Sequence, residues 1–378
     1  MPLDLVEFGK KLRRYREQLQ LSVAEVLSGT GIADHRLEAF ERGEITPTGD
    51  EVLILADFFR CDYRFFVSNE KLAAFEQTDT LYRRYGDEFS RADRRRVQEL
   101  LFLCECEHFL LLELHRPVEA FRFTPSGNYF KGHAEQAASS LRQHFHYAAT
   151  AVPSDVYSDF RRIGFHVFRR RLDNSNISGL TIRHPSVGAC LLVNYSEDVY
   201  RQRFTAAHEA AHGILDSGED VVVSFTTRDR NSLIEVRANT FASRYLLPRE
   251  LVTNIPVTKW SRYEVTRWAN KLKVSTTALA IALKEAGIVN DATAKYLAEV
   301  RVPAEAKTDP ELENLTGRSA ERKVELLQRG LTSFYVNLCF EAHSSGVITA
   351  QRAAEMMLVD DFELTEIADL FNVRLLVE

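Results

Sequence analysis

The sequence lacks the features of a secreted or membrane-spanning protein. Its first residues, MPLDLVEFGKKLRRYREQ, contain no apolar core, so we expect no secretory signal there. The most apolar run, LLFLCECEHFLLLEL (Leu100–Leu114), is too short and too charged to cross a bilayer, and it predicts a buried helix. The five cysteines form no C-x-x-C pair, which favours a reduced, cytoplasmic setting without a cysteine-bound metal. We therefore predict a cytoplasmic protein with no membrane partner.

The sequence also has no excess of positively charged residues. The chain has 54 acidic residues against 48 Lys and Arg, a net charge of −6. This balance argues against a protein that coats nucleic acid, although it is compatible with a local basic face. The densest basic cluster consists of Arg83, Arg84, Arg91, Arg94, Arg95 and Arg96. Such a cluster usually forms a solvated helix face, and contact with a DNA backbone is the alternative.

The length and the pattern of apolar residues predict an α+β protein that is mostly α. A chain of 378 residues is long enough for several domains. We predict five short helices in a helix-turn-helix arrangement over 1–68, a helical connector over 69–151, a zincin-like small sheet with helices over 152–290, and a helical region over 291–378. Inside the last region, VRVPAEAKTDPELENLTGR (300–318) is polar and contains prolines, so it predicts a linker or a mobile surface segment.

The first region combines helical spacing of apolar residues with a glycine turn. Ser22 is a plausible N-cap for the second helix, and Gly31 makes the turn before the third. Five short helices in this order resemble the lambda-repressor-like helix-turn-helix of the Xre family. The residues that carry the resemblance are Leu12, Arg13, Ser22, Gly31, Leu37, Glu41, Gly43, Pro47, Leu55 and Ala56.

The resemblance implies a homodimer that binds a palindromic duplex DNA operator. Asp34, His35 and Arg36 stand at the exposed start of the third helix, where they would read base edges. Two features oppose this function. Val23 occupies the place where the family usually has glutamine, and residues 1–67 hold nine Lys and Arg against twelve Asp and Glu. A protein-docking or dimerising module is therefore an equal alternative.

The stretch RFTAAHEAAHGIL (Arg203–Leu215) places two histidines four residues apart, with a glutamate directly after the first. On a helix, residues four apart share one face, so His208 and His212 can direct two imidazoles at one metal ion. Glu209 projects alongside, where it can hold an attacking water and take its proton. The alternative is a helix with two hydrogen-bonded histidines and no metal, but the apolar residues on the rest of this helix favour a buried metal site.

A third ligand should come from a neighbouring helix. The best candidate is Glu235, at the start of IEVRANTFASRYLLP. Asn239 lies one helical turn later on the same face, where it could orient a ligand histidine. Two nitrogen ligands, one oxygen ligand, a base and one open position are the composition of a catalytic Zn²⁺ site.

These two motifs resemble the ImmA/IrrE metallopeptidase family. The likeness covers about 156–283 and rests on RFTAAHEAAHGIL followed by E-x-x-A-N-x-F-A-x-x-x-L-L-P. It implies that His208, His212 and Glu235 bind zinc and that Glu209 is the general base. Members of the family cleave helix-turn-helix repressors during stress or in mobile elements. Fusion to an Xre-like domain resembles a subgroup of regulators and antitoxins.

Three functions follow from this combination. The first is a regulatory zinc endopeptidase that cuts a repressor or a related protein, and the presence of Glu209 favours it. The second is a DNA-binding regulator or an antitoxin with a cognate toxin, in which the zinc domain is a sensor or scaffold. The third is a protein-binding antitoxin without turnover. Among other polar residues, we interpret His184 as a turn residue, and Tyr195 and Tyr200 as either packing residues or oxyanion donors.

Overall fold

The computed structural model describes residues 3–68, 75–119, 121–126, 130–216, 218–226, 232–257, 259–303, 306–307 and 309–375. Its contacts divide the chain into two compact units. Unit 1 comprises Met1–Arg116, Arg183–Cys190 and Ser333–Glu378, and unit 2 comprises Pro117–Ile182 and Leu191–Thr332. The fold is α+β and mostly α, which confirms the predicted class.

Five short helices form the N-terminal part of unit 1: α1 (Leu5–Gln18), α2 (Val23–Thr30), α3 (Asp34–Arg42), α4 (Gly49–Phe59) and α5 (Tyr63–Val67). Ser22 caps α2 in a capping box, because its hydroxyl accepts from Glu25 N while the Glu25 carboxylate accepts from Ser22 N. Gly31 ends α2 with φ of 68°, a left-handed conformation that a side chain would strain. The predicted helices and the predicted glycine turn are confirmed.

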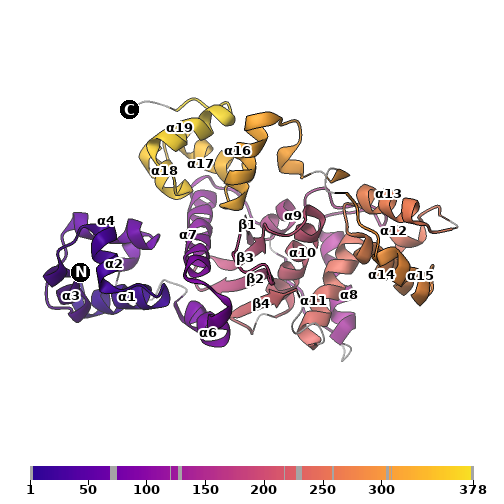
Figure 1. Ribbon diagram of the computed structural model, residues 1–378, viewed down its shortest axis with the longest axis horizontal. Coiled ribbons are helices and arrows are strands. Elements are labelled where there is room, and N and C mark those ends of the chain that lie inside the picture. The colour runs from indigo at the N-terminus through magenta and orange to yellow at the C-terminus, as the bar shows by residue number, and fades with distance from the viewer. Residues whose placement is uncertain are drawn as a thin grey trace. The chain divides into compact units, whose positions relative to one another are not determined.

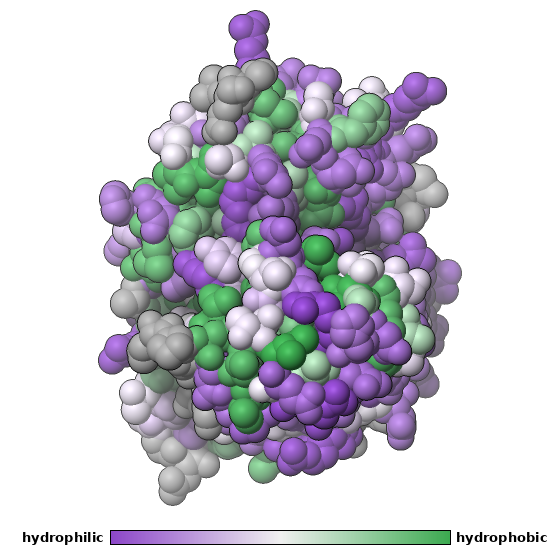
Figure 2. Space-filling model, turned by 90° about the vertical axis from the view of Figure 1, so that its left-hand side faces the viewer, coloured by the Kyte–Doolittle hydropathy of each residue, from purple (hydrophilic) through white to green (hydrophobic). Residues whose placement is uncertain are grey.

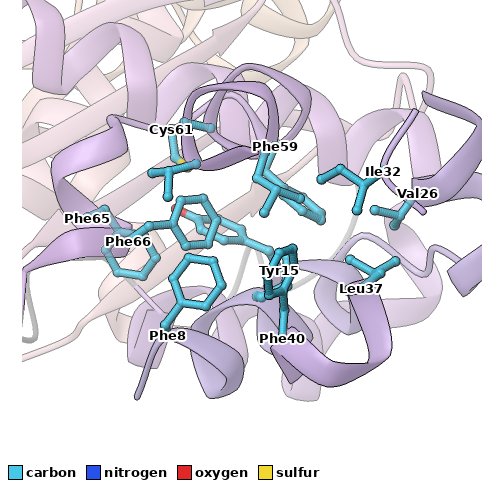
Figure 3. Close-up of a cluster of buried hydrophobic side chains, with 14 of the residues drawn as sticks. Phe8, Tyr15, Val26, Ile32, Leu37, Phe40, Phe59, Cys61, Phe65 and Phe66 are labelled. Carbon is cyan, nitrogen blue, oxygen red and sulfur yellow. The ribbon is translucent and has the colours of Figure 1, made fainter. Parts of the chain in front are cut away.

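Aromatic rings fill the core of these five helices. In Figure 3 the labelled rings come from α1, α3, α4 and α5 and point toward one another. Tyr15 stacks on Phe59 with ring centroids 5.5 Å apart, and Phe8 meets Phe40 edge to face at 5.8 Å. Burying each such side chain contributes roughly 1.5–3 kcal/mol. The helix-turn-helix region therefore has a hydrophobic core of its own.

The remaining helical elements of unit 1 include one long helix, α7 (Arg91–Glu113). The others are α6 (Phe75–Tyr85), η1 (Gly86–Glu88), α17 (Ser333–Ser344), α18 (Ala350–Met357) and α19 (Asp361–Leu370). The apolar run Leu100–Leu114 lies almost wholly in α7, where it is largely buried, as predicted. Figure 1 shows α17 and α18 at one end of α7, and both contact it. Within the described residues, no helix is long and apolar enough to span a membrane.

The basic cluster does not form a single solvated face. Arg94 is buried, its guanidinium donates to the Gln18 carbonyl at 3.1 Å, and it lies 4.2 Å from the centre of the Tyr82 ring. The solvated interpretation is therefore wrong for Arg94, which joins α7 to α1 and α6. A buried guanidinium must satisfy its donors within the protein, and carbonyl and ring partners do so here.

Unit 2 consists of a small sheet and the helices around it. Its elements are α8 (Phe130–His144), α9 (Val156–Arg162), β1 (His166–Arg170), β2 (Ile177–His184), β3 (Gly188–Asn194), α10 (Val199–Leu215), β4 (Val221–Phe225), α11 (Leu233–Leu246), α12 (Arg249–Thr253), α13 (Arg262–Leu272), α14 (Thr276–Glu285), α15 (Asp291–Ala298), η3 (Pro310–Leu312) and α16 (Gly317–Gln328). The tip of the β2–β3 hairpin, Arg183–Cys190, belongs to unit 1.

The sheet has the strand order β1-β3-β2-β4. β4 pairs antiparallel with β2, with Leu180 opposite Val223, and it is the last strand of the sheet. The sequence analysis did not identify β4, although VVVSF is rich in β-branched residues that favour strands. The end of this edge strand borders the cleft beside the candidate metal cluster.

The segment 300–318 is predicted to be a linker or a mobile surface segment. Residues 304, 305 and 308 lie outside the described residues, and most of the others are exposed or half-buried. Asp309 is an exception, because it is buried and its Oδ2 accepts from Arg169 Nη1 of β1 at 2.5 Å. A buried guanidinium on β1 needs a carboxylate partner, which this polar segment supplies.

Candidate metal centre

Two buried helices, α10 and α11, pack against each other and carry the predicted metal site. α10 begins at an N-cap, Asp198, whose carboxylate accepts from two backbone amides of the first turn. Ser232 caps α11 by accepting from Glu235 N at 3.2 Å. Ala207 and Ala211 are completely buried, and their small side chains permit close approach of a neighbouring helix. The caps and the small residues thus fix where the two helices meet.

The three predicted ligands lie together. One ligand atom from each of His208, His212 and Glu235 falls within 4.8 Å of the others, and all three residues are buried. The Nε2 atoms of the two histidines are 3.1 Å apart. Glu235 Oε2 lies 3.2 Å from His208 Nε2, and Oε1 lies 3.4 Å from His212 Nε2.

The opposite nitrogen of each imidazole faces an oxygen. His208 Nδ1 lies 3.1 Å from Asn239 Oδ1, and His212 Nδ1 lies 2.8 Å from Asp216 Oδ2. An oxygen partner places the proton on Nδ1, so each Nε2 keeps its lone pair for a metal. Asn239 therefore contacts a candidate ligand from the position where the sequence analysis expected it.

The charges of this cluster fit a bound cation. Two lone pairs and a carboxylate repel one another unless a proton or a metal ion lies between them. Burial opposes the charged form of His212, but hydrogen bonds with Asp216 and Glu235 raise its pKa to about 9. Burial likewise opposes ionisation of Glu235, but its contacts with His208 and His212 lower its pKa to about 2. The acidic partners that favour a proton on His212 would also favour a divalent metal ion in its place.

Glu209 differs from the three ligand candidates because it lies outside their cluster. It is completely buried, and burial raises the pKa of its carboxyl group. Its Oε2 accepts from Thr181 Oγ1 of β2 at 2.8 Å, whereas Oε1 has no partner in hydrogen-bond geometry among the described groups, although the nearby Ser224 side chain also lowers the pKa of Glu209. A Cβ at Gly179 would lie 2.8 Å from Oε1, so the glycine leaves room for this oxygen. A carboxylate with one unengaged oxygen and a raised pKa is suited to accept a proton.

Sequence reasoning missed three residues that support the site. Asp216 lies four residues after His212, so helical spacing could have identified it. It also pairs with Arg237 of α11, whose guanidinium lies 4.0 Å from the centre of the Phe130 ring. Thr181 and Gly179 come from β2, and nothing in the sequence indicates that this strand would contact Glu209.

Three other polar residues have structural partners. His184 is not a turn residue, as the sequence analysis had it, but the buried last residue of β2, with Nε2 3.0 Å from Glu105 Oε1. The Tyr200 hydroxyl donates to Asn270 Oδ1 at 2.9 Å, and the Arg169 guanidinium lies 5.6 Å from the centre of the Tyr195 ring. For the two tyrosines, these contacts favour packing over oxyanion binding.

A cleft of about 580 Å³ opens beside the metal cluster within unit 2. His208, Glu235 and Asn239 line it, and residues 224–226 at the end of the edge strand β4 form part of its wall. Its apolar lining residues are Phe204, Phe225, Val236, Ile281 and Val302. A cleft of this size, with an edge strand and one wall of ligand candidates, has room for a peptide segment.

The predicted DNA contacts lie at the start of α3. Asp34 and His35 are exposed, whereas the Arg36 guanidinium is bidentate on the Glu51 carboxylate, with Nη2 2.7 Å from Oε2. The hydrogen bonds from Arg36 lower the pKa of Glu51 to about 2. Arg36 is thus held by an acid of its own domain, which reduces its attraction for DNA.

The homodimer remains a prediction, and an apolar face on the described surface of this region could support it. On the face of unit 1 that Figure 2 shows, hydrophilic and hydrophobic side chains are interleaved. Leu53 and Ile54 of α4 are exposed, but isolated apolar residues at a surface are normal. They do not by themselves identify a dimer interface.

Two stretches of the chain match family models. Residues 160–284 match a peptidase family described as the IrrE N-terminal-like domain, and residues 7–63 match a helix-turn-helix domain. The first match runs from α9 to α14 and includes the H-E-x-x-H helix and Glu235. A comparison with curated proteins gave no significant match. The chain thus joins an IrrE N-terminal-like peptidase domain to a helix-turn-helix domain, as the resemblances implied.

Proposed function

We propose that this protein is a regulatory zinc endopeptidase of the cytoplasm that cleaves a helix-turn-helix repressor or a related regulatory protein. The observation that carries the proposal is the convergence of His208, His212 and Glu235 beside a buried, half-satisfied Glu209. A structural zinc site would fill a fourth ligand position with a protein group, and three ligand candidates leave that position open.

Each side chain of the centre has a separate task in this mechanism. His208, His212 and Glu235 would hold Zn²⁺, while Asn239 and Asp216 keep the imidazoles in the tautomer that exposes Nε2. When bound, zinc polarises a carbonyl and lowers the pKa of water.

Glu209 is the proposed general base. It would accept the proton of the attacking water through its unengaged oxygen and then pass the proton to the leaving amine. Its hydrogen bond from Thr181 fixes the carboxylate during both transfers, because one oxygen stays anchored to β2.

The substrate segment would be extended when it is cleaved. β4 is the last strand of the sheet, and its end lines the cleft beside the metal cluster. An extended peptide can add to such an edge through main-chain hydrogen bonds, while apolar pockets select its side chains. We therefore infer that the protein cuts a locally unfolded segment containing apolar residues.

Glu209→Gln separates binding from catalysis. This variant keeps the shape of the side chain and should retain about one zinc per chain, measured by elemental analysis. Cleavage of a candidate repressor should fall by about 10²–10⁴-fold, because only the proton acceptor is lost. Glu313→Gln, a change at an exposed position, is the matched control. Cleavage by the Glu209 variant at the native rate would exclude Glu209 as the base.

A second candidate function is a DNA-binding regulator or antitoxin, in which the zinc domain serves as a sensor or scaffold. The observation that favours it is the complete helix-turn-helix region with exposed Asp34 and His35 at the start of α3. A gel shift with the promoter of its own operon tests this function. Binding with retention of a full zinc complement but no cleavage of a co-encoded repressor or toxin would favour it over the peptidase.

A further inference from the structure

A second cavity, of about 230 Å³, lies within unit 1. Its walls come from α1 and α5 of the helix-turn-helix region, from α7, from the tip of the β2–β3 hairpin and from α18. The proposed peptidase mechanism uses none of its residues. A cavity of about 150 Å³ accommodates benzene, so this one has room for a single ring with a short polar chain.

Aromatic and sulfur-containing side chains make most of this cavity apolar. Tyr15, Phe65, Phe102 and Phe109 contribute rings, and Met356 contributes a thioether. Lys11 and Arg64 already lie 4.6 and 5.8 Å from the ring centres of Phe65 and Phe109. Ring faces attract cations, as these two contacts show.

The cavity wall holds two carboxylates and two guanidiniums, and both guanidiniums contact Asp62 rather than the half-buried Glu105. Asp62 is balanced by Arg64 at 2.8 Å and faces Arg352 at 3.4 Å. Glu105 has only His184 as an ion-pair or hydrogen-bond partner within the described part of the chain.

His184 meets Glu105 through Nε2 and the backbone through Nδ1. Its Nδ1 accepts from the backbone amides of Ser186 and Val187, at 3.1 and 3.3 Å. Nδ1 therefore carries no proton, and Nε2–H donates to Glu105. The carboxylate of Glu105 is thus hydrogen-bonded but not neutralised. The charge of Glu105 acts inside the cavity. Burial is the main cause that raises the pKa of the Cys61 thiol there, and the charge of Glu105 raises it further.

We propose that this cavity binds a small organic cation, an ammonium carried on one aromatic ring or an aliphatic chain of similar size. The ammonium would pair with Glu105, and the apolar body would lie against Phe102 and Tyr15. This ligand supplies the charge that Glu105 lacks and replaces water in an apolar cavity.

Occupancy of the cavity would stabilise unit 1. The ligand would contact helices of the helix-turn-helix region as well as α7 and α18, and a ligand that binds only the folded arrangement stabilises it by mass action. The helix-turn-helix region would then respond to a metabolite independently of the zinc centre.

The test uses the full chain and two probes that share a phenylethyl body and carry opposite charges, 2-phenylethylammonium and 3-phenylpropionate. Calorimetry and thermal unfolding should show saturable binding and stabilisation by the ammonium and not by the carboxylate. Equal binding of both probes, or no saturable binding of the ammonium, overturns the proposal. This comparison needs only the native protein, so it does not depend on how any variant folds.

Glu105→Gln locates the charge that recognises the probe. The amide oxygen can still accept from His184 Nε2, so the packing is kept and only the charge is lost. We expect binding of the ammonium to weaken at least about tenfold. Glu113→Gln, an exposed change on the same helix, should bind as the native protein does. Unchanged affinity in the Glu105 variant would overturn the assignment.

Discussion

Carboxylates have different partners in the helix-turn-helix region and in the candidate metal centre. In the helix-turn-helix region, Glu41 pairs with Arg16 at 2.6 Å and Glu51 pairs with Arg36, so the acids neutralise cations and fix the helices. In the metal centre, Glu235 faces two imidazoles and Glu209 keeps one oxygen unengaged. Acids that already hold a cation stabilise a fold, whereas acids that lack one indicate where a ligand or a reaction is expected.

The largest effect should follow from removing one ligand of the metal centre. His212→Ala takes away an imidazole and leaves Glu235 and Asp216 as buried acids with fewer partners. We expect loss of zinc, loss of cleavage and a lower melting temperature than that of the zinc-loaded native protein. Elemental analysis and thermal unfolding measure these changes. His115→Ala, at an exposed position of unit 1, is the control. A variant that keeps a full zinc complement would contradict the proposed ligand set.

A smaller loss of zinc affinity should follow from changing a residue that hydrogen-bonds to a proposed ligand. Asp216→Asn preserves an oxygen for His212 Nδ1 but removes the charge that raises the pKa of His212. Changes of this kind in a supporting residue lower metal affinity by about 10–100-fold. Competition with a zinc chelator measures the affinity. Asp220→Asn, a nearby exposed change, should leave it unaltered. If both variants bind zinc equally, Asp216 does not support the ligand.

Most residues of the candidate metal centre could be predicted because they follow local helical spacing. His208, Glu209 and His212 lie on one helix, and Glu235 and Asn239 lie on the next. Spacing groups the residues of each helix, but it does not show that the two helices pack together. Asp216 follows the same rule and could have been included. Thr181 and Gly179 could not, because their contact with Glu209 depends on how β2 packs against α10, which no local pattern encodes.

Predictions for exposed polar segments were less accurate. Arg94 and Asp309 each occur in a stretch whose polarity indicates a solvated surface, yet both are buried. Each has a distant partner, Gln18 for Arg94 and Arg169 for Asp309, that satisfies its polar group inside the protein. Composition describes how polar a segment is, but the burial of a polar residue depends on whether the fold brings a complementary group into contact with it.

The smallest effect should come from an acid of the helix-turn-helix region. Glu51→Gln removes the charge that holds Arg36 while keeping an oxygen for the Thr48 cap of α4. Ion pairs near a surface contribute about 0.2–1 kcal/mol, so the loss of stability at neutral pH should fall in that range. Because the folded-state pKa of Glu51 is lowered to about 2 from an ordinary 4.5, its stabilisation is present above 4.5 and is lost as the pH falls toward 2. Denaturant unfolding at pH 7 and near pH 2.5 should therefore show the difference between native protein and variant shrinking with acid. A difference in stability that stays constant between these two pH values would show that Glu51 does not act through its charge.

The same variant releases Arg36 and removes one negative charge from the helix-turn-helix region, so any operator binding should strengthen.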